Sequence, residues 1–219
     1  MKKQIQVEMP GSWEDITLSK FLAMTKDMDA YADDVDAQLA FVIHHLTGLD
    51  LSRLKNLSIE SFNILKQNID ELFSRQENDL VRFVTIDGIE YGFEPNLSKM
   101  SYGAYVDITK FNDIQINDNW SKIMNILYRP VEKKQGENYS IKEYDGNNEH
   151  EKWLGVGMNV HFGALFFLLN LCKDLLISTL NYTKVMVKEE SYKQILEKSG
   201  ELTKQLLNYQ EEIYSKYKM

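Results

Sequence analysis

Two short runs near the middle of the chain alternate apolar and polar residues on either side of Asp87-Gly88. The alternating positions are Val81, Phe83 and Thr85 before the dipeptide and Ile89, Tyr91 and Phe93 after it. Side chains two residues apart share one face of a strand, and Asp-Gly readily takes the positive φ angles of a tight hairpin turn. The pattern predicts a β-hairpin at about residues 80–94 that ends at Pro95.

Most of the remaining chain has the spacing of helices, with apolar residues three and four positions apart. Only three prolines and eleven glycines occur among the 219 residues, so long helices are permitted. Three predicted helices are marked by their caps, at Thr17 or Ser19, at Ser101, and at Asn117 or Asp118. Four others are given by their approximate spans, residues 39–48, 58–75, 159–187 and 191–217. A period-two pattern at residues 4–9 predicts a further strand.

Residues 131–149 are polar and rich in Gly, Asn and Lys, which is typical of a loop or a boundary between subdomains. Tyr139 to Tyr144 is a possible strand within this segment, and Pro130 is expected to stop the helix before it. The predicted fold class is mainly α (α+β): a helical bundle with a small β element and long C-terminal helices. The expected organisation is residues 1–130, a polar loop at 131–149 and residues 150–219, together forming one compact domain.

Charge and cysteine content narrow the class of protein. A net charge of −8 favours solubility and repels phosphate backbones, so no nucleic-acid partner is expected. The single cysteine, Cys172, excludes an internal disulfide and fits a reducing compartment, where it would be a buried, inert thiol. The apolar segment 160–180 contains Asn170, Lys173 and Asp174, so it predicts a buried core helix and no membrane span.

The chain contains no familiar catalytic or cofactor signature. The acidic stretch from Asp27 to Asp36 has Ala32 and Gln38 where a calcium loop needs glycine and glutamate, so a solvated connector is expected. His44 and His45 are adjacent on a helix and point in different directions, and only His150 with His161 offers a marginal metal site. No phosphate-binding loop, dinucleotide fingerprint or nucleophile elbow is present, so we expect no cofactor, no metal and no enzyme activity.

Residues 191–217 carry a heptad-like seam of about three repeats. Its candidate partner-binding positions are Tyr192, Ile195, Leu202, Leu206, Tyr209 and Ile213. One interpretation is an amphipathic helix that docks on its own domain, and the other is a helix for a partner or for self-association. Tyr128 and Arg129 are further candidates, because these residue types dominate interface energies. A helix end capped by Arg129 and stopped by Pro130 is the structural alternative.

Several short patches spread over most of the chain have a familiar pattern. They are Trp13 with Ile16-Thr17-Leu18, Ile86-Asp87-Gly88 with Tyr91 and Pro95, Leu97 with Met100, Gly103 and Asp107, residues 126–130, Tyr139 with Tyr144, and Gly163-Ala164 with Phe166-Phe167. Together they resemble small proteins from the structural and assembly gene blocks of tailed bacteriophages, especially the crAss-like phages of Bacteroidetes hosts. The resemblance implies a packaged virion component or a tail-assembly chaperone, and it assigns no residue a role.

These observations lead to one main hypothesis and two alternatives. The main hypothesis is a non-enzymatic virion structural or assembly protein that binds other phage structural proteins and lies in the virion or in the cytoplasm of the infected host cell. The first alternative is a helical adaptor or regulatory module that acts on a host or phage protein. The second is an enzyme whose site is assembled from distant carboxylates or histidines, which a single sequence does not reveal.

Overall fold

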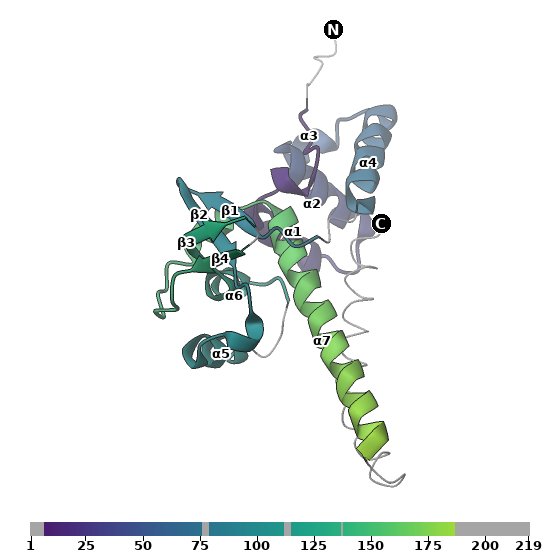
Figure 1. Cartoon of the computed structure of the whole chain (residues 1–219). Coiled ribbons are helices and arrows are strands. Elements are labelled where there is room, and N and C mark those ends of the chain that lie inside the picture. The colour runs from purple at the N-terminus through teal and green to yellow at the C-terminus, as the bar shows by residue number, and fades with distance from the viewer. Residues whose placement is uncertain (1–6, 76–78, 112–114, 137, 187–219) are drawn as a thin grey trace.

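The computed structural model describes residues 7–75, 79–111, 115–136 and 138–186, and the side chains of α7 up to Asp174 except Cys172. Within this part the chain forms an α+β fold with seven α-helices and one four-stranded antiparallel sheet of order β1-β2-β3-β4. In Figure 1 the sheet lies beside the first half of the long helix α7, with α5 and α6 on the same side and α1 to α4 on the other. The α+β class is confirmed.

Four helices make up the N-terminal region. They are α1 (Leu18–Ala30), α2 (Val35–Thr47), α3 (Leu51–Leu54) and α4 (Ile59–Ser74). The side chains of Thr17, Asp34 and Ser58 accept hydrogen bonds from main-chain NH groups in the first turns of α1, α2 and α4, as N-cap residues do. Gly48 ends α2 with a φ of 71°, the left-handed conformation that glycine adopts most easily. The predicted cap at Thr17, the stop at Gly48 and the helix at about residues 58–75 are confirmed, whereas α2 begins at Val35 and so four residues before the predicted span, and α3 was not predicted.

The predicted hairpin is the first half of the sheet. Its strands are β1 (Phe83–Ile86) and β2 (Ile89–Phe93). Asp87 and Gly88 connect them with φ angles of 51° and 78°, as a two-residue turn with two positive φ values requires. The prediction of a hairpin around Asp87-Gly88 is confirmed.

The second half of the sheet corrects the prediction for residues 131–149. Strand β3 (Tyr128–Gln135) follows α6 directly, and β4 (Asn138–Ile141) returns beside it. Pro130 lies inside β3 opposite Tyr91, so it does not act as the helix stop we expected. The sequence did not predict β3 because the exposed part of this strand consists of lysines, glutamate and glutamine. About half of the predicted polar loop is a second hairpin, formed by β3 and β4.

The sheet curls so that its two edge strands approach each other. The rings of Phe83 in β1 and Tyr139 in β4 lie 4.7 Å apart, although two strands separate them in the sheet. Gly92 in β2 makes this possible, because a Cβ there would lie 2.9 Å from Tyr139 and 3.0 Å from Ile141. The Tyr139 hydroxyl donates to the carbonyl of Phe93 at 2.6 Å and holds β4 across β2.

Three later helices complete the described fold. They are α5 (Tyr102–Thr109), α6 (Trp120–Leu127) and α7 (Met158–Met186), with three short 3₁₀ helices at Trp13–Asp15, Leu97–Lys99 and Glu151–Gly155. Ser101 caps α5 as predicted, whereas Asn119 and not Asn117 or Asp118 precedes α6. The side chains of α7 are buried from Val160 to Leu169, apart from a half-buried Phe167, and become exposed at Asn170, Lys173 and Asp174. The predicted buried core helix is confirmed only for that first stretch.

Aromatic packing joins the two ends of the described chain into one core. Trp13 lies edge-on to Phe162 of α7 at 4.9 Å and to Phe73 of α4 at 5.0 Å. The main-chain NH of Met158 donates to the carbonyl of Ile16, so the start of α7 is also bound to the start of α1. The polar segment after residue 131 therefore does not separate the packing of the N-terminal helices from that of α7.

Two further expectations for the N-terminal region are wrong. Residues 7–9 are not in a strand, and Val7 and Met9 simply pack against the core; residues 4–6 lie outside the described part. The acidic stretch is also not a connector along its whole length, because Asp27 and Asp29 belong to α1 and Asp36 to α2. The connection between these helices is only residues 31–34.

Candidate functional site

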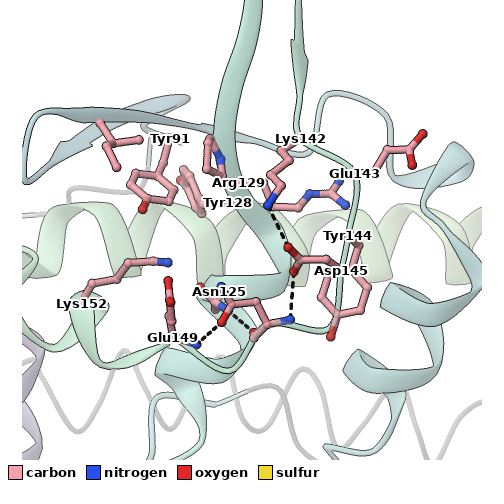
Figure 2. Close-up of a pocket in the computed structure, with 13 residues that line it drawn as sticks. Tyr91, Asn125, Tyr128, Arg129, Lys142, Glu143, Tyr144, Asp145, Glu149 and Lys152 are labelled. Atoms are coloured by element: carbon pink, nitrogen blue, oxygen red, sulfur yellow. Dashed lines mark hydrogen bonds and ion pairs between the residues drawn. The ribbon is translucent and has the colours of Figure 1, made fainter.

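A polar cleft of about 190 Å³ opens between the sheet and the chain segment that follows β4. Figure 2 shows its lining side chains converging from β2, α6, β3, residues 142–149 and the 3₁₀ helix at Glu151–Gly155. The lining residues are Ile89, Tyr91, Asn125, Tyr128, Arg129, Pro130, Lys142, Glu143, Tyr144, Asp145, Asn147, Glu149 and Lys152. The cleft is therefore built by residues that are up to 63 positions apart in the sequence (from 89 to 152).

The floor of the cleft begins where α6 becomes β3. Tyr128 is fully buried there, and its hydroxyl donates to the carbonyl of Val81 at 2.6 Å. Burial raises the pKa of Tyr128 well above its usual value, so this hydroxyl stays protonated at physiological pH. Its role in the fold is to anchor the junction of α6 and β3 to the residues before β1.

Arg129 lies beside Tyr128 and forms a buried ion pair with Glu94. The side chains of Arg129 and Glu94 are 10% and 9% exposed, so each charge depends on the other for its stability in the interior. The Arg129 Nε atom has no hydrogen-bond partner among the described residues. The pair fixes one positive and one negative charge under the cleft.

The outer wall is residues 142–149, which cross the cleft as an irregular segment held by side-chain contacts. Lys142 Nζ lies 2.9 Å from Asp145 Oδ2, and the Tyr144 hydroxyl donates to Asp107 of α5 at 2.6 Å. Burial, followed by the bond to Asp107, raises the pKa of Tyr144 to about 12. The bond to Lys110, followed by the one to Tyr144, lowers the pKa of Asp107. This wall is thus attached to α5 through a neutral hydroxyl and an ionised carboxylate.

The opposite rim carries Lys152, whose Nζ lies 4.8 Å from the centre of the Tyr91 ring. Asn125 of α6 ties the rim to the wall, since its amide NH₂ donates to the carbonyl of Asn147 at 2.8 Å and its oxygen accepts from Trp153. Three cations and three carboxylates line the cleft in all, so its net charge is balanced. Such a cleft suits a polar group presented by another molecule, held by several weak contacts.

Two of the eight predicted site residues belong to the part of the chain that the structure describes. Tyr192, Ile195, Leu202, Leu206, Tyr209 and Ile213 lie outside the described residues. Tyr128 and Arg129 are buried and engaged with Val81 and Glu94, so neither presents the surface that an interface hot spot needs. The helix-capping interpretation of Arg129 is also corrected, because α6 already ends at Leu127 and Arg129 pairs with Gly92 in the sheet.

The histidines have structural partners. Trp120 Nε1 donates to His161 Nδ1 at 3.1 Å in the core, and Ser121 Oγ lies 2.9 Å from His150 Nδ1. Burial lowers the pKa of His161 to about 4, against a smaller opposite effect of the carbonyls of Trp153 and Val156. Within the described part of the chain, no three His, Cys, Asp or Glu side chains are grouped closely enough to hold a metal ion.

Sequence reasoning missed the exposure of α5. Tyr102 and Tyr105 of this helix are 82% and 57% exposed, and only Ala104 is buried. A signal was available for Tyr102, since Ala104 and Ile108 lie on the side of the helix away from it, whereas Tyr105 neighbours Ile108 and its exposure is not evident from spacing. After the cleft, the aromatic side of α5 is the second surface feature of the described fold.

A comparison with known proteins gives no relative, since no family model, curated protein or solved structure matches the chain. In the described residues no helix is both long enough and apolar enough to span a lipid bilayer. The fold and its two surface features thus define the chain as an α+β protein with a balanced polar cleft and an exposed aromatic helix.

Proposed function

We propose that this chain is a non-enzymatic structural or assembly protein of a tailed bacteriophage, which acts through contacts with other phage proteins. The sequence resemblance supports the phage context. The observation that carries the protein-contact part is the aromatic side of α5, where two large side chains lie in solvent. Tyrosine is among the residue types that contribute most to binding at protein interfaces.

Helix α5 is suited to such a contact because little of its surface serves the fold. It packs through the small side chain of Ala104 and the half-buried Ile108, and it is tied to the cleft wall through Asp107 and Tyr144. A partner that covers Tyr102 and Tyr105 would remove their rings from water without disturbing either attachment. Each ring offers a large, rigid contact area at a low entropy cost.

The length of α7 is a second support. Its 29 residues correspond to about 43 Å, and the described side chains leave the core after Leu169. Figure 1 shows the second half of α7 extending well past the sheet and the other labelled helices. A projecting helix is a common element of assembly interfaces. The heptad-like seam predicted at residues 191–217 lies outside the described residues and remains a separate candidate for partner binding.

Site-specific crosslinking tests the proposal. A photoreactive phenylalanine analogue at Tyr102, irradiated in infected cells, is expected to crosslink to a phage structural protein. The same analogue at Ile59 is the matched control, because that side chain is also 82% exposed but lies on α4. Capture of the same phage protein from both positions, or of a host protein from position 102, would contradict the proposal.

Mass spectrometry of purified virions beside the lysate distinguishes the two forms of the proposal. A packaged virion component is present in particles at a fixed stoichiometry. A tail-assembly chaperone is present only in the lysate, together with its structural partner. Absence from particles combined with co-purification of host proteins alone would instead identify the host-directed adaptor.

A further inference from the structure

A second exposed apolar surface lies where α1 meets α2, far along the chain from α5. Tyr31, the residue directly after α1, is 47% exposed, and Val35, the first residue of α2, is 70% exposed. The main-chain NH of Asp34 donates to the carbonyl of Tyr31 at 3.0 Å, which closes the turn between the two side chains. We refer to Tyr31, Val35 and the turn between them as the α1–α2 junction.

The exposed ring of Tyr31 is supported from within the fold. It lies on the half-buried Phe41 of α2, with ring centres 5.0 Å apart and planes inclined by 34°. The stacking holds one face of the Tyr31 ring against the protein. A supported ring of this kind is a ready surface for a flat or cationic side chain of a partner.

The charges around the junction indicate the chemistry of that partner. Five aspartates lie between residues 27 and 36, and no lysine or arginine occurs from residue 27 to residue 52. They are Asp27, Asp29, Asp33, Asp34 and Asp36. Asp27 contacts His45 at 2.7 Å and Asp34 caps α2, whereas Asp33 and Asp36 are exposed. Exposed aspartates thus directly flank the apolar side chains of Tyr31 and Val35 along the chain.

We propose that the α1–α2 junction is a docking surface for a lysine- or arginine-rich protein segment that carries an apolar residue. The apolar residue packs on Val35 and Tyr31, a cationic side chain lies over the Tyr31 ring, and neighbouring cations face Asp33 and Asp36. Nucleic acid does not fit this surface, because its phosphates would meet the same aspartates. The inference is independent of the proposal for α5, since it uses other residues.

The N-terminus of α4 provides a matched control for the N-terminus of α2. Val35 and Ile59 are each the first residue of a helix, both are β-branched and both are exposed. Asp36 and Glu60 are each the second residue, and both are acidic. The control site differs in having no run of aspartates beside it in the sequence, and its nearest aromatic residue, Phe62, is half-buried and packs against the core.

The test measures binding of a fluorescent amphipathic peptide made of lysine and leucine at helical spacing to the full chain. We expect Val35→Ser with Asp36→Asn to weaken binding by about tenfold or more, and Ile59→Ser with Glu60→Gln to change it less than about twofold. A peptide with every lysine replaced by glutamate is expected not to bind. Raising the salt concentration is expected to weaken the binding of the lysine peptide.

Separate substitutions distinguish docking from diffuse attraction. Asp36→Asn alone and Val35→Ser alone should each weaken binding, because both the charge and the apolar contact contribute. Equal binding after Val35→Ser, equal loss at the α4 control, or equal binding of the glutamate peptide would each overturn the proposal. All four substitutions are at exposed positions, so circular dichroism is expected to give unchanged folding.

Discussion

Helices α5 and α6 have the same length of eight residues and pack against each other, but they have opposite relations to the core. Six side chains of α6 are buried, compared with Ala104 alone in α5. Burial of each large apolar side chain stabilises a fold by about 1.5–3 kcal/mol. The comparison separates a helix that stabilises the core, α6, from a helix that leaves its two tyrosine rings in solvent, α5.

The sharpest test of this division replaces the largest side chain of α6. Trp120 is fully buried and donates to His161, so Trp120→Ala leaves both a cavity and an acceptor without its donor. We expect a loss of about 3–5 kcal/mol in the free energy of unfolding, measured by urea denaturation. A loss below about 1 kcal/mol would mean that α6 is not the stabilising member of the pair.

Acidification should also lower the free energy of unfolding through a buried contact of α6, the one between Trp120 and His161. Because Trp120 donates to Nδ1, His161 is neutral with its proton on Nε2, and burial lowers its pKa from 6.5 to about 4. The folded state therefore favours the neutral ring, and this stability is present above pH 6.5 and lost as the pH falls toward 4. The full effect is on the order of 3 kcal/mol.

The control for acidification is His161→Gln, which keeps an acceptor for Trp120 but does not titrate. Its free energy of unfolding should fall less than that of the unaltered protein between pH 6.5 and pH 4. Parallel curves for the two proteins would show that His161 is not the group responsible. Both curves also contain the loss of ionised carboxylates at the lower end of the range.

The contrast between these helices also explains which parts of the structure could be predicted. Caps and turns are local, so Thr17, Ser58, Ser101 and Asp87-Gly88 reveal their roles in sequence alone. Strand β3 depends on a tertiary partner, since its exposed half is polar and only the pairing with β2 and β4 makes it a strand. Arg129 has the residue type of an interface anchor, but its contact with Glu94 is set by the sheet and not by spacing.

The cleft was unpredictable for the same reason. Its lining residues come from three stretches of the sequence (89–91, 125–130 and 142–152), and the bonds that position them join positions such as 107 and 144 or 125 and 147. Pairs at such separations have no fixed spacing that a single sequence displays. The exposure of Tyr102 could have been predicted, since Ala104 and Ile108 lie on the side of the helix away from it and such spacing is a local pattern.

A smaller effect is expected from the bond that attaches α5 to the cleft wall. Tyr144→Phe removes the hydroxyl that donates to Asp107 and leaves the ring beside Gly103. We expect the amides of α5 to exchange with solvent several-fold faster, up to about tenfold, with little change in global stability. Tyr105→Phe is the matched control, because it removes a hydroxyl from α5 itself. Equal exchange in both variants would mean that the packing of Ala104 and Ile108, and not this hydrogen bond, holds the helix.

The smallest effect on stability, and the most informative one for function, is expected at Tyr102. Its ring is 82% exposed, so Tyr102→Ala should change the free energy of unfolding by no more than about 0.5 kcal/mol. If α5 is a binding helix, the same substitution should still weaken partner capture, because truncating an interface tyrosine commonly costs 1 kcal/mol or more, roughly fivefold or greater in affinity. Pull-down of the crosslinked partner from infected-cell lysate with Tyr102→Ala and with Ile59→Ala measures both sides of this prediction. Unchanged capture by the Tyr102 variant would leave α5 as an exposed helix without a binding role, and the difference between α5 and α6 would then be one of packing alone.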